Sequence, residues 1–140
     1  AIPARGLATA DFDGDGRLDA VVANIDAAPT LLKNVSGEKN NWLTIKLVGD
    51  PARKTPRDAV GAVVFVQTGK LRQRFDLTSG ASYASQPEQR IFVGLGAQTK
   101  IDSLEVVWPG GGGGSQTERF SVEKVNTQIT IRQGAGARGN

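Results

Sequence analysis

Apolar and polar residues alternate along most of this chain with a period of two, and helical periodicity is nearly absent. In the stretch 42–48, for example, Leu43, Ile45 and Leu47 fall on one face of an extended strand. Gly, Pro, Asn and Asp residues separate the alternating stretches, as is typical of turns between strands. The expected strands cover residues 42–48, 62–68, 70–77, 91–93, 103–108 and 127–132. This pattern predicts an all-β fold, a β-sandwich or jelly-roll-like domain.

The first forty residues have a different organisation. Two short apolar stretches, 6–10 and 18–24, flank an acidic loop and predict a β-hairpin. We therefore expect a hairpin unit with an N-terminal arm over residues 1–40, a β-domain over 41–133 and a tail over 134–140. The run Gly110 to Ser115 is expected to be a flexible connection, and no function is assigned to it.

The acidic loop carries the clearest candidate chemistry. Four carboxylates, those of Asp11, Asp13, Asp15 and Asp19, alternate closely with glycines. Carboxylates gathered in one small volume repel each other unless a cation lies between them, and a flexible set of oxygen ligands suits Ca²⁺ best. We assign these four aspartates as side-chain ligands and the carbonyl of Arg17 as a backbone ligand.

This loop is not an EF-hand. An EF-hand needs a glutamate at the twelfth position of the loop and a helix on each side. Counting from Asp11, the twelfth residue is Val22, and the flanking segments are strand-like. The alternative interpretation is an acidic turn that binds no metal.

The composition excludes several classes of function. The 140 residues are 39% hydrophobic, which predicts a globular fold, and they contain no Cys or His, which removes thiol and imidazole catalysis. The net charge of +3 comes from scattered basic residues without interleaved aromatics, so we expect no nucleic-acid partner. No apolar run is long enough to span a membrane.

Several motifs resemble a known pairing of domains. Residues 6–34, with 5–24 above all, resemble one FG-GAP/VCBS-type calcium-binding repeat, a kind that normally forms blades of β-propellers. Residues 41–133 resemble an ASPIC/UnbV domain, which often follows such repeats in secreted proteins related to cartilage acidic protein. The matching stretches of the second resemblance lie at 41–43 with 47–49, 57–64, 79–86, 92–96 and 106–111.

The resemblance implies an extracellular or cell-surface location, a Ca²⁺ ligand role for the four aspartates, and no catalytic residues. We therefore expect a non-catalytic protein that mediates adhesion or recognises a protein or a glycan. The alternative is a structural subunit of an extracellular fibre, assembled head-to-tail by exchange of N-terminal strands. Asn34 begins an Asn-Val-Ser sequon and is a candidate glycosylation site, although a plain turn explains the same residues.

A single hairpin of this kind cannot bury its own apolar face. Three solutions are open. The hairpin packs on its own β-domain, the chain is part of a longer propeller protein, or the N-terminal segment pairs with a neighbouring subunit.

Overall fold

Strands account for almost all regular structure in the computed structural model, which describes residues 3–37, 39–80, 83–110 and 116–138. One short 3₁₀ turn, η1, spans Pro51–Arg53. In chain order, the strands are β1 (Ala4–Ala10), β2 (Asp19–Asn24), β3 (Thr30–Leu32), β4 (Asn41–Val48), β5 (Val63–Thr68), β6 (Leu71–Asp76), β7 (Ile91–Gly96), β8 (Ser103–Trp108), β9 (Gln116–Phe120), β10 (Thr127–Arg132) and β11 (Ala137–Arg138). The prediction of an all-β fold is confirmed.

The chain divides into two compact units. The first contains Ala1–Lys39 together with Ser79–Glu88, and the second contains Asn40–Thr78 together with Gln89–Asn140. The segment between β6 and β7 thus belongs to the same unit as the N-terminal hairpin. Each unit is described separately below.

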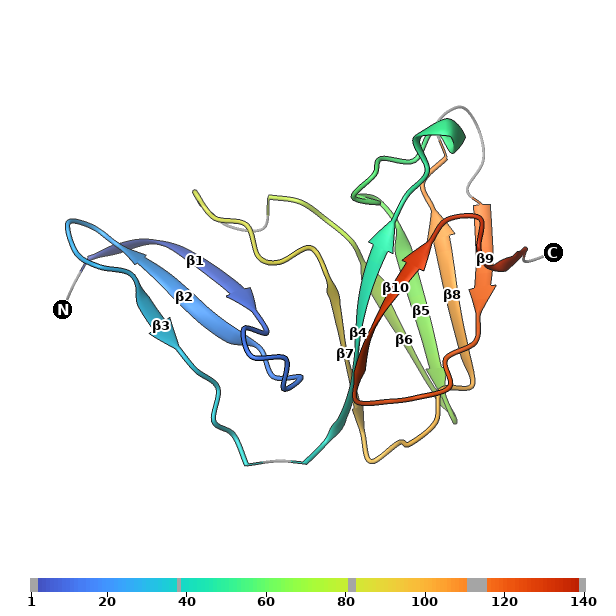
Figure 1. The fold of residues 1–140 in the computed structure, drawn as a ribbon, viewed down its shortest axis with the longest axis horizontal. Coiled ribbons are helices and arrows are strands. Elements are labelled where there is room, and N and C mark those ends of the chain that lie inside the picture. The colour runs from blue at the N-terminus through green and yellow to red at the C-terminus, as the bar shows by residue number, and fades with distance from the viewer. Residues whose placement is uncertain (1–2, 38, 81–82, 111–115, 139–140) are drawn as a thin grey trace. The chain divides into compact units, whose positions relative to one another are not determined.

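The second unit contains two sheets (Figure 1). One sheet has three strands in the order β10-β4-β7, and the other has five in the order β11-β9-β8-β5-β6. β4 runs parallel to β10 and antiparallel to β7, whereas the five-stranded sheet is antiparallel throughout. β5 and β6 are joined by the two-residue turn Gly69-Lys70, as the sequence predicts.

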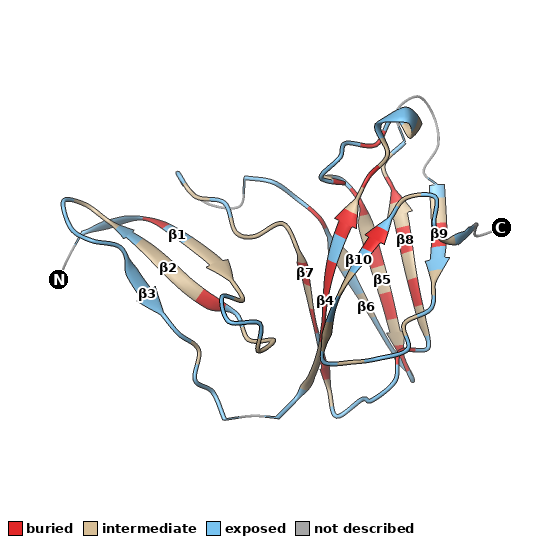
Figure 2. Ribbon diagram, in the orientation of Figure 1, coloured by how far each residue is buried: buried red, intermediate tan, exposed pale blue. Residues whose placement is uncertain are grey.

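Inward-facing residues of both sheets pack into one apolar core, which makes this unit a β-sandwich. Leu43, Ile45 and Leu47 alternate into it from β4, as expected, with exposed fractions of 4% or less. Figure 2 shows the same alternation of buried and less buried positions along β5 and β8. Trp108, at the end of β8, is fully buried in this core.

Strands β3, β9 and β11 are not among those expected from the alternation. β9 carries Glu118, a charged residue that is only 2% exposed. Its carboxylate accepts hydrogen bonds from the backbone nitrogens of Gly134, at 2.9 Å, and Gly136, at 3.4 Å, and it lies 3.5 Å from the Arg53 guanidinium. These contacts satisfy a buried charge and hold the chain after β10, so part of the expected tail forms β11.

Three of the sequence-based expectations concern residues outside the described ranges. They are the N-terminal arm, at residues 1–2, the glycine-rich run, at residues 111–115, and the tail, at residues 139–140. Within the described ranges, no helix has the length and hydropathy needed to cross a membrane.

The core can be tested by a matched pair of truncations. We expect Leu43→Ala to lower the free energy of unfolding by about 2–5 kcal/mol, because it leaves a cavity where an unexposed side chain packs. Leu71→Ala should change it by less than about 0.5 kcal/mol, because Leu71 is 57% exposed. Urea unfolding followed by tryptophan fluorescence measures both, since both tryptophans lie in this unit. Equal losses for the two variants would contradict the described core.

Candidate functional site

The first unit is built around the sheet β1-β2-β3 and has almost no apolar interior. Among its described residues, only Gly6 and Asp19 are buried. Gly6 on β1 packs against the segment Ser79–Glu88 of the same unit. A Cβ added at Gly6 would stand 3.5 Å from the Ala84 carbonyl oxygen. The backbone nitrogen of Glu88 also donates to the Thr9 carbonyl, at 3.1 Å. The unit is therefore held mainly by backbone pairing and polar contacts.

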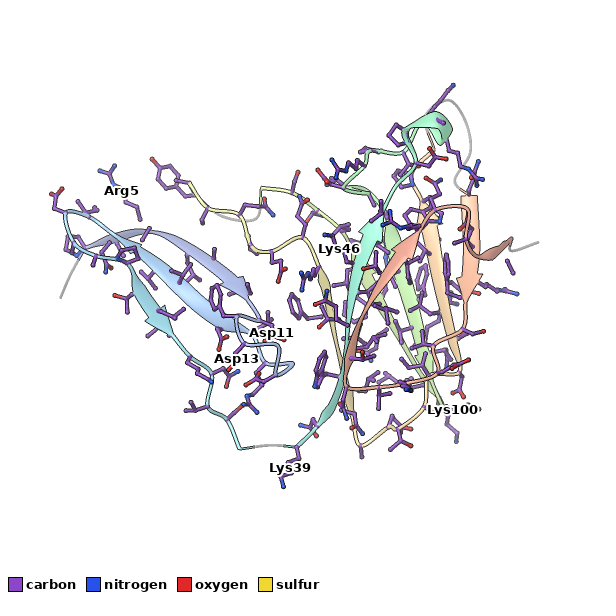
Figure 3. The ribbon with its side chains drawn as sticks, in the orientation of Figure 1. Arg5, Asp11, Asp13, Lys39, Lys46 and Lys100 are labelled. Atoms are coloured by element: carbon purple, nitrogen blue, oxygen red, sulfur yellow. The ribbon has the colours of Figure 1, made fainter. Side chains whose placement is uncertain are left out.

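The aspartate loop, residues 11–18, connects β1 to β2. Strand pairing ends at Ala10 and Asp19, which lie opposite each other, so the loop begins and ends at one point. Figure 3 labels Asp11 and Asp13 at this end of the hairpin. Gly14 and Gly16 have φ angles of 74° and 85°, a left-handed conformation that favours glycine, as the tight turn requires.

The Asp11 carboxylate organises the backbone of the loop. One of its oxygens accepts from the nitrogens of Gly14, at 2.8 Å, and Asp15, at 3.1 Å, while the other accepts from Gly16 at 2.9 Å. These bonds curl the loop around the carboxylate.

Three of the four predicted carboxylate ligands come together. Oxygen atoms of Asp11, Asp13 and Asp15 all lie within 4.8 Å of one another, and no other acidic group of this kind occurs in the described ranges. Ca²⁺ binds oxygen at about 2.3–2.6 Å, so oxygens on opposite sides of one ion stand at about this separation. The donor set and its spacing therefore fit Ca²⁺.

Asp19 lies outside that group and makes two bonds to the backbone. It is 4% exposed, and its oxygens accept from the nitrogens of Phe12, at 3.1 Å, and Asn34, at 2.8 Å. It therefore fastens both the start of the loop and the segment after β3. Its role as a metal ligand stays a prediction.

Two basic side chains pair with the aspartates of the loop, and the sequence pattern indicates only one of them, Arg17. Arg17 pairs with Asp15, and its Nε donates to the Asn34 carbonyl at 3.1 Å. Lys33 pairs with Asp13 and was not anticipated as a site residue. The signal that would have found it is the return of the chain in β3, because Leu32 pairs with Ala20 and brings the next residue beside the loop. Any ligand role of the Arg17 carbonyl stays a prediction.

The ion pair shifts both partners' titration. The hydrogen bond between Asp13 and Lys33 lowers the pKa of Asp13 and raises the pKa of Lys33. The charges of Asp15 and Asp19 also raise the Lys33 pKa. A cation at this position therefore interacts with three of the four aspartates.

The predicted glycosylation residue is part of this network. The Asn34 side-chain nitrogen donates to the Leu18 carbonyl at 3.3 Å, and its oxygen accepts from the Ser36 nitrogen at 3.0 Å. A glycan on Asn34 would leave its side-chain nitrogen a single N–H for the first of these bonds, and the modification stays a prediction.

Comparisons with known proteins match a family model to more than half of the chain. Residues 52–138 match the family model described as ASPIC and UnbV. The chain is similar to cartilage acidic protein 1 from Xenopus tropicalis, with 37% identity over 110 residues, 76% of this chain and 16% of that protein. It is also similar to cartilage acidic protein 1 from Mus musculus, with 33% identity over 130 residues, 90% of this chain and 19% of that protein. The human protein of the same name is 33% identical over 110 residues, 76% of this chain. The chain thus spans less than a fifth of the length of these curated relatives.

The effect of Lys33 on Asp13 is measurable by carboxyl ¹³C NMR. In the absence of metal, we expect Lys33→Gln to raise the Asp13 pKa towards its ordinary value of 3.8. An aspartate with a lowered pKa stabilises the folded state above its unfolded-state pKa, and that contribution disappears as the pH falls through the lowered value. Lys33→Gln should therefore reduce this loss of folding stability at acid pH.

Lys39→Gln is the control, because it neutralises an exposed lysine of the same unit that has no ion pair with a described residue. An Asp13 pKa that responds equally to both substitutions would contradict a specific pair.

Proposed function

Because this chain belongs to the ASPIC and UnbV family, we propose that it is an extracellular, non-catalytic protein that binds one Ca²⁺ in its aspartate loop and mediates adhesion or recognition of a protein or glycan. The observation that carries the proposal is the convergence of three carboxylates in a unit without an apolar interior. Such a unit needs another source of stability, and a bound metal is a common one in small domains.

In this proposal, Asp11, Asp13 and Asp15 bind the ion through their carboxylates, with Asp19 and the Arg17 carbonyl as further ligands. Without metal, four carboxylates and the two cations Arg17 and Lys33 leave a local charge of −2, by subtraction, which attracts a divalent cation. Lys33 holds the position of a competing cation, and it moves away from Asp13 when the metal binds. The ion then links the beginning and end of the loop and so stabilises the β1–β2 pairing.

Residues 1–40 are proposed to form a single FG-GAP/VCBS-type repeat. Its antiparallel strands on either side of an aspartate- and glycine-rich loop support this assignment. The extracellular location is proposed from the relatives, whose name refers to cartilage. A non-catalytic role agrees with a chain that has neither His nor Cys to act as a base or nucleophile near neutral pH.

An apolar surface available for recognition of a protein lies in the first unit. Most of the large apolar side chains that are strongly exposed belong to this unit, namely Leu7, Phe12, Leu18, Leu31, Leu32, Val35 and Tyr83. Exposed apolar residues at this density are typical of a surface that contacts another protein.

A second candidate function, a fibre subunit, is favoured by one specific feature of this surface. β3 is an edge strand, and all three of its residues are exposed, with Leu31 at 61% and Leu32 at 52%. An exposed apolar edge is able to pair with a strand of a second copy.

Calorimetric titration tests the metal. We expect CaCl₂ to bind with one-to-one stoichiometry, and Asp13→Asn to weaken binding by more than about tenfold, because one charged ligand is lost. Lys33→Gln should tighten binding, because it removes the competing cation. Asp26→Asn is the matched control, since Asp26 is exposed in the turn after β2 and its left-handed φ of 53° tolerates asparagine. No heat in the parent protein, or equal losses in Asp13→Asn and Asp26→Asn, would refute the assignment.

Light scattering after gel filtration separates the two candidate functions. A recognition module should have the mass of one chain, 14.7 kDa, in both calcium and EDTA. If larger species form in calcium, Leu31→Ser should reduce them to monomers and the exposed Leu71→Ser of β6 should not. That outcome would replace recognition with self-assembly as the proposed function.

A further inference from the structure

A polar cavity of about 260 Å³ lies in the second unit, at the carboxyl ends of the parallel strands β4 and β10. Lys46 and Val48 line it from β4, and Thr130 and Arg132 line it from β10. Arg57 and Asp58 complete its wall from the connection between β4 and β5. This cavity shares no residue with the aspartate loop.

Strand register places these side chains on one face. Lys46 pairs with Thr130 and Val48 with Arg132, so their side chains project from the same side of the sheet. The intervening Leu47 and Ile131 point to the other side and are buried in the core. The cavity therefore opens on the face of the sheet opposite the core, and Figure 3 labels Lys46 there.

The loop that carries Arg57 and Asp58 is fixed against β4. The Gly49 nitrogen donates to the Arg57 carbonyl at 2.9 Å. A Cβ at position 49 would lie 2.1 Å from the Pro56 carbonyl oxygen, so only glycine allows this approach. The two charged residues thus stand over the strand ends in a defined position.

The charges of the cavity are unpaired. Lys46, Arg57 and Arg132 form no ion pair or side-chain hydrogen bond with the described residues, and neither does Asp58. Basic side chains elsewhere in this unit, such as Arg72 and Arg119, pair with a carboxylate. Three cations and one carboxylate give the cavity a net charge of +2, by subtraction. Like charges brought together without partners favour binding of an anion.

We infer that this cavity binds an acidic saccharide, whose sulfate or carboxylate group lies among Lys46, Arg57 and Arg132. Arginine pairs with such groups through two parallel hydrogen bonds. The Asp58 carboxylate and the Thr130 hydroxyl accept hydrogen bonds from the sugar hydroxyls. A ligand that is purely anionic would meet repulsion at Asp58, whereas a saccharide carries both kinds of group.

This inference adds a ligand class to the recognition role proposed above, but it does not depend on calcium. All seven residues that line the cavity, Leu47 included, lie in the second unit, and none is an expected metal ligand. Binding should therefore be the same in calcium and in EDTA. Failure of the calcium titration would leave this test unaffected, and the reverse also holds.

The test is calorimetric titration of the full chain with a heparin-derived tetrasaccharide and with its desulfated counterpart. We expect the sulfated form to bind, and each of Lys46→Gln, Arg57→Gln and Arg132→Gln to weaken binding by about tenfold through loss of a charge-assisted hydrogen bond. Lys70→Gln is the matched control, because Lys70 is an exposed lysine in the β5–β6 turn, away from the cavity. The control should leave affinity unchanged within about twofold, allowing for long-range screening.

A second variant separates a saccharide from a simple anion. Asp58→Ala should tighten binding of inorganic sulfate, because a negative charge is removed, but it should not tighten binding of the tetrasaccharide, because hydrogen bonds to its hydroxyls are lost. The inference would be overturned by equal effects of Lys46→Gln and Lys70→Gln, by a single-stranded DNA oligonucleotide binding as tightly as the saccharide, or by sulfate and saccharide responding alike to Asp58→Ala.

Discussion

Repulsion among the aspartates of the β1–β2 loop is the constraint on which the first unit depends. The loop gathers Asp11, Asp13 and Asp15 within 4.8 Å of one another, and the chain compensates by turning backbone nitrogens and two basic side chains towards them. The negative charge of Asp19 is compensated by backbone hydrogen bonds. This residue is one of only two buried residues described in the unit, and both of its oxygens accept from the backbone. The fold of this hairpin thus depends on compensating negative charge, and the proposed divalent cation would contribute the largest compensating charge.

The second unit is stabilised in a different way. Alternating apolar residues from two sheets fill one core, and Trp108 is fully enclosed there. Among its described residues, the one deeply buried carboxylate, that of Glu118, anchors the chain after β10 and lies beside no other acid. A metal is therefore expected to matter for the hairpin and not for the sandwich. This difference explains why saccharide binding by the second unit should not depend on calcium.

Most of the sandwich could be predicted from the sequence, because its strands β4, β8 and β10 follow the period-two rule and β5 is a run rich in β-branched residues. β9 could not be predicted, because Glu118 occupies its inward position. From sequence alone, a glutamate indicates a solvent-exposed position. β3 was missed because its residues are all exposed and show no alternation. Grouping of Ser79–Glu88 with the hairpin depends on contacts far apart in the chain, which local patterns do not reveal.

The candidate metal site could be predicted only in part, because some of its contacts also join residues far apart in the chain. The spacing of the aspartates indicates a loop of oxygen donors, and three of them do converge. Local spacing does not show that the Asp19 carboxylate bonds to the backbone of Asn34, or that Lys33 returns to face Asp13. Both features arise from the pairing of β2 with β3, a contact that the hairpin pattern alone does not include.

Hydrogen–deuterium exchange of the full chain, in calcium and in EDTA, tests most directly whether a cation holds the hairpin. If the proposal holds, calcium should slow exchange throughout β1 and β2 and leave the core strands β4, β5 and β8 unchanged, because only the first unit depends on the metal. Exchange that is the same in both conditions along β1 and β2 would contradict the claim. Asp11 to Asp19 would then form an acidic turn stabilised by Arg17, Lys33 and the backbone alone.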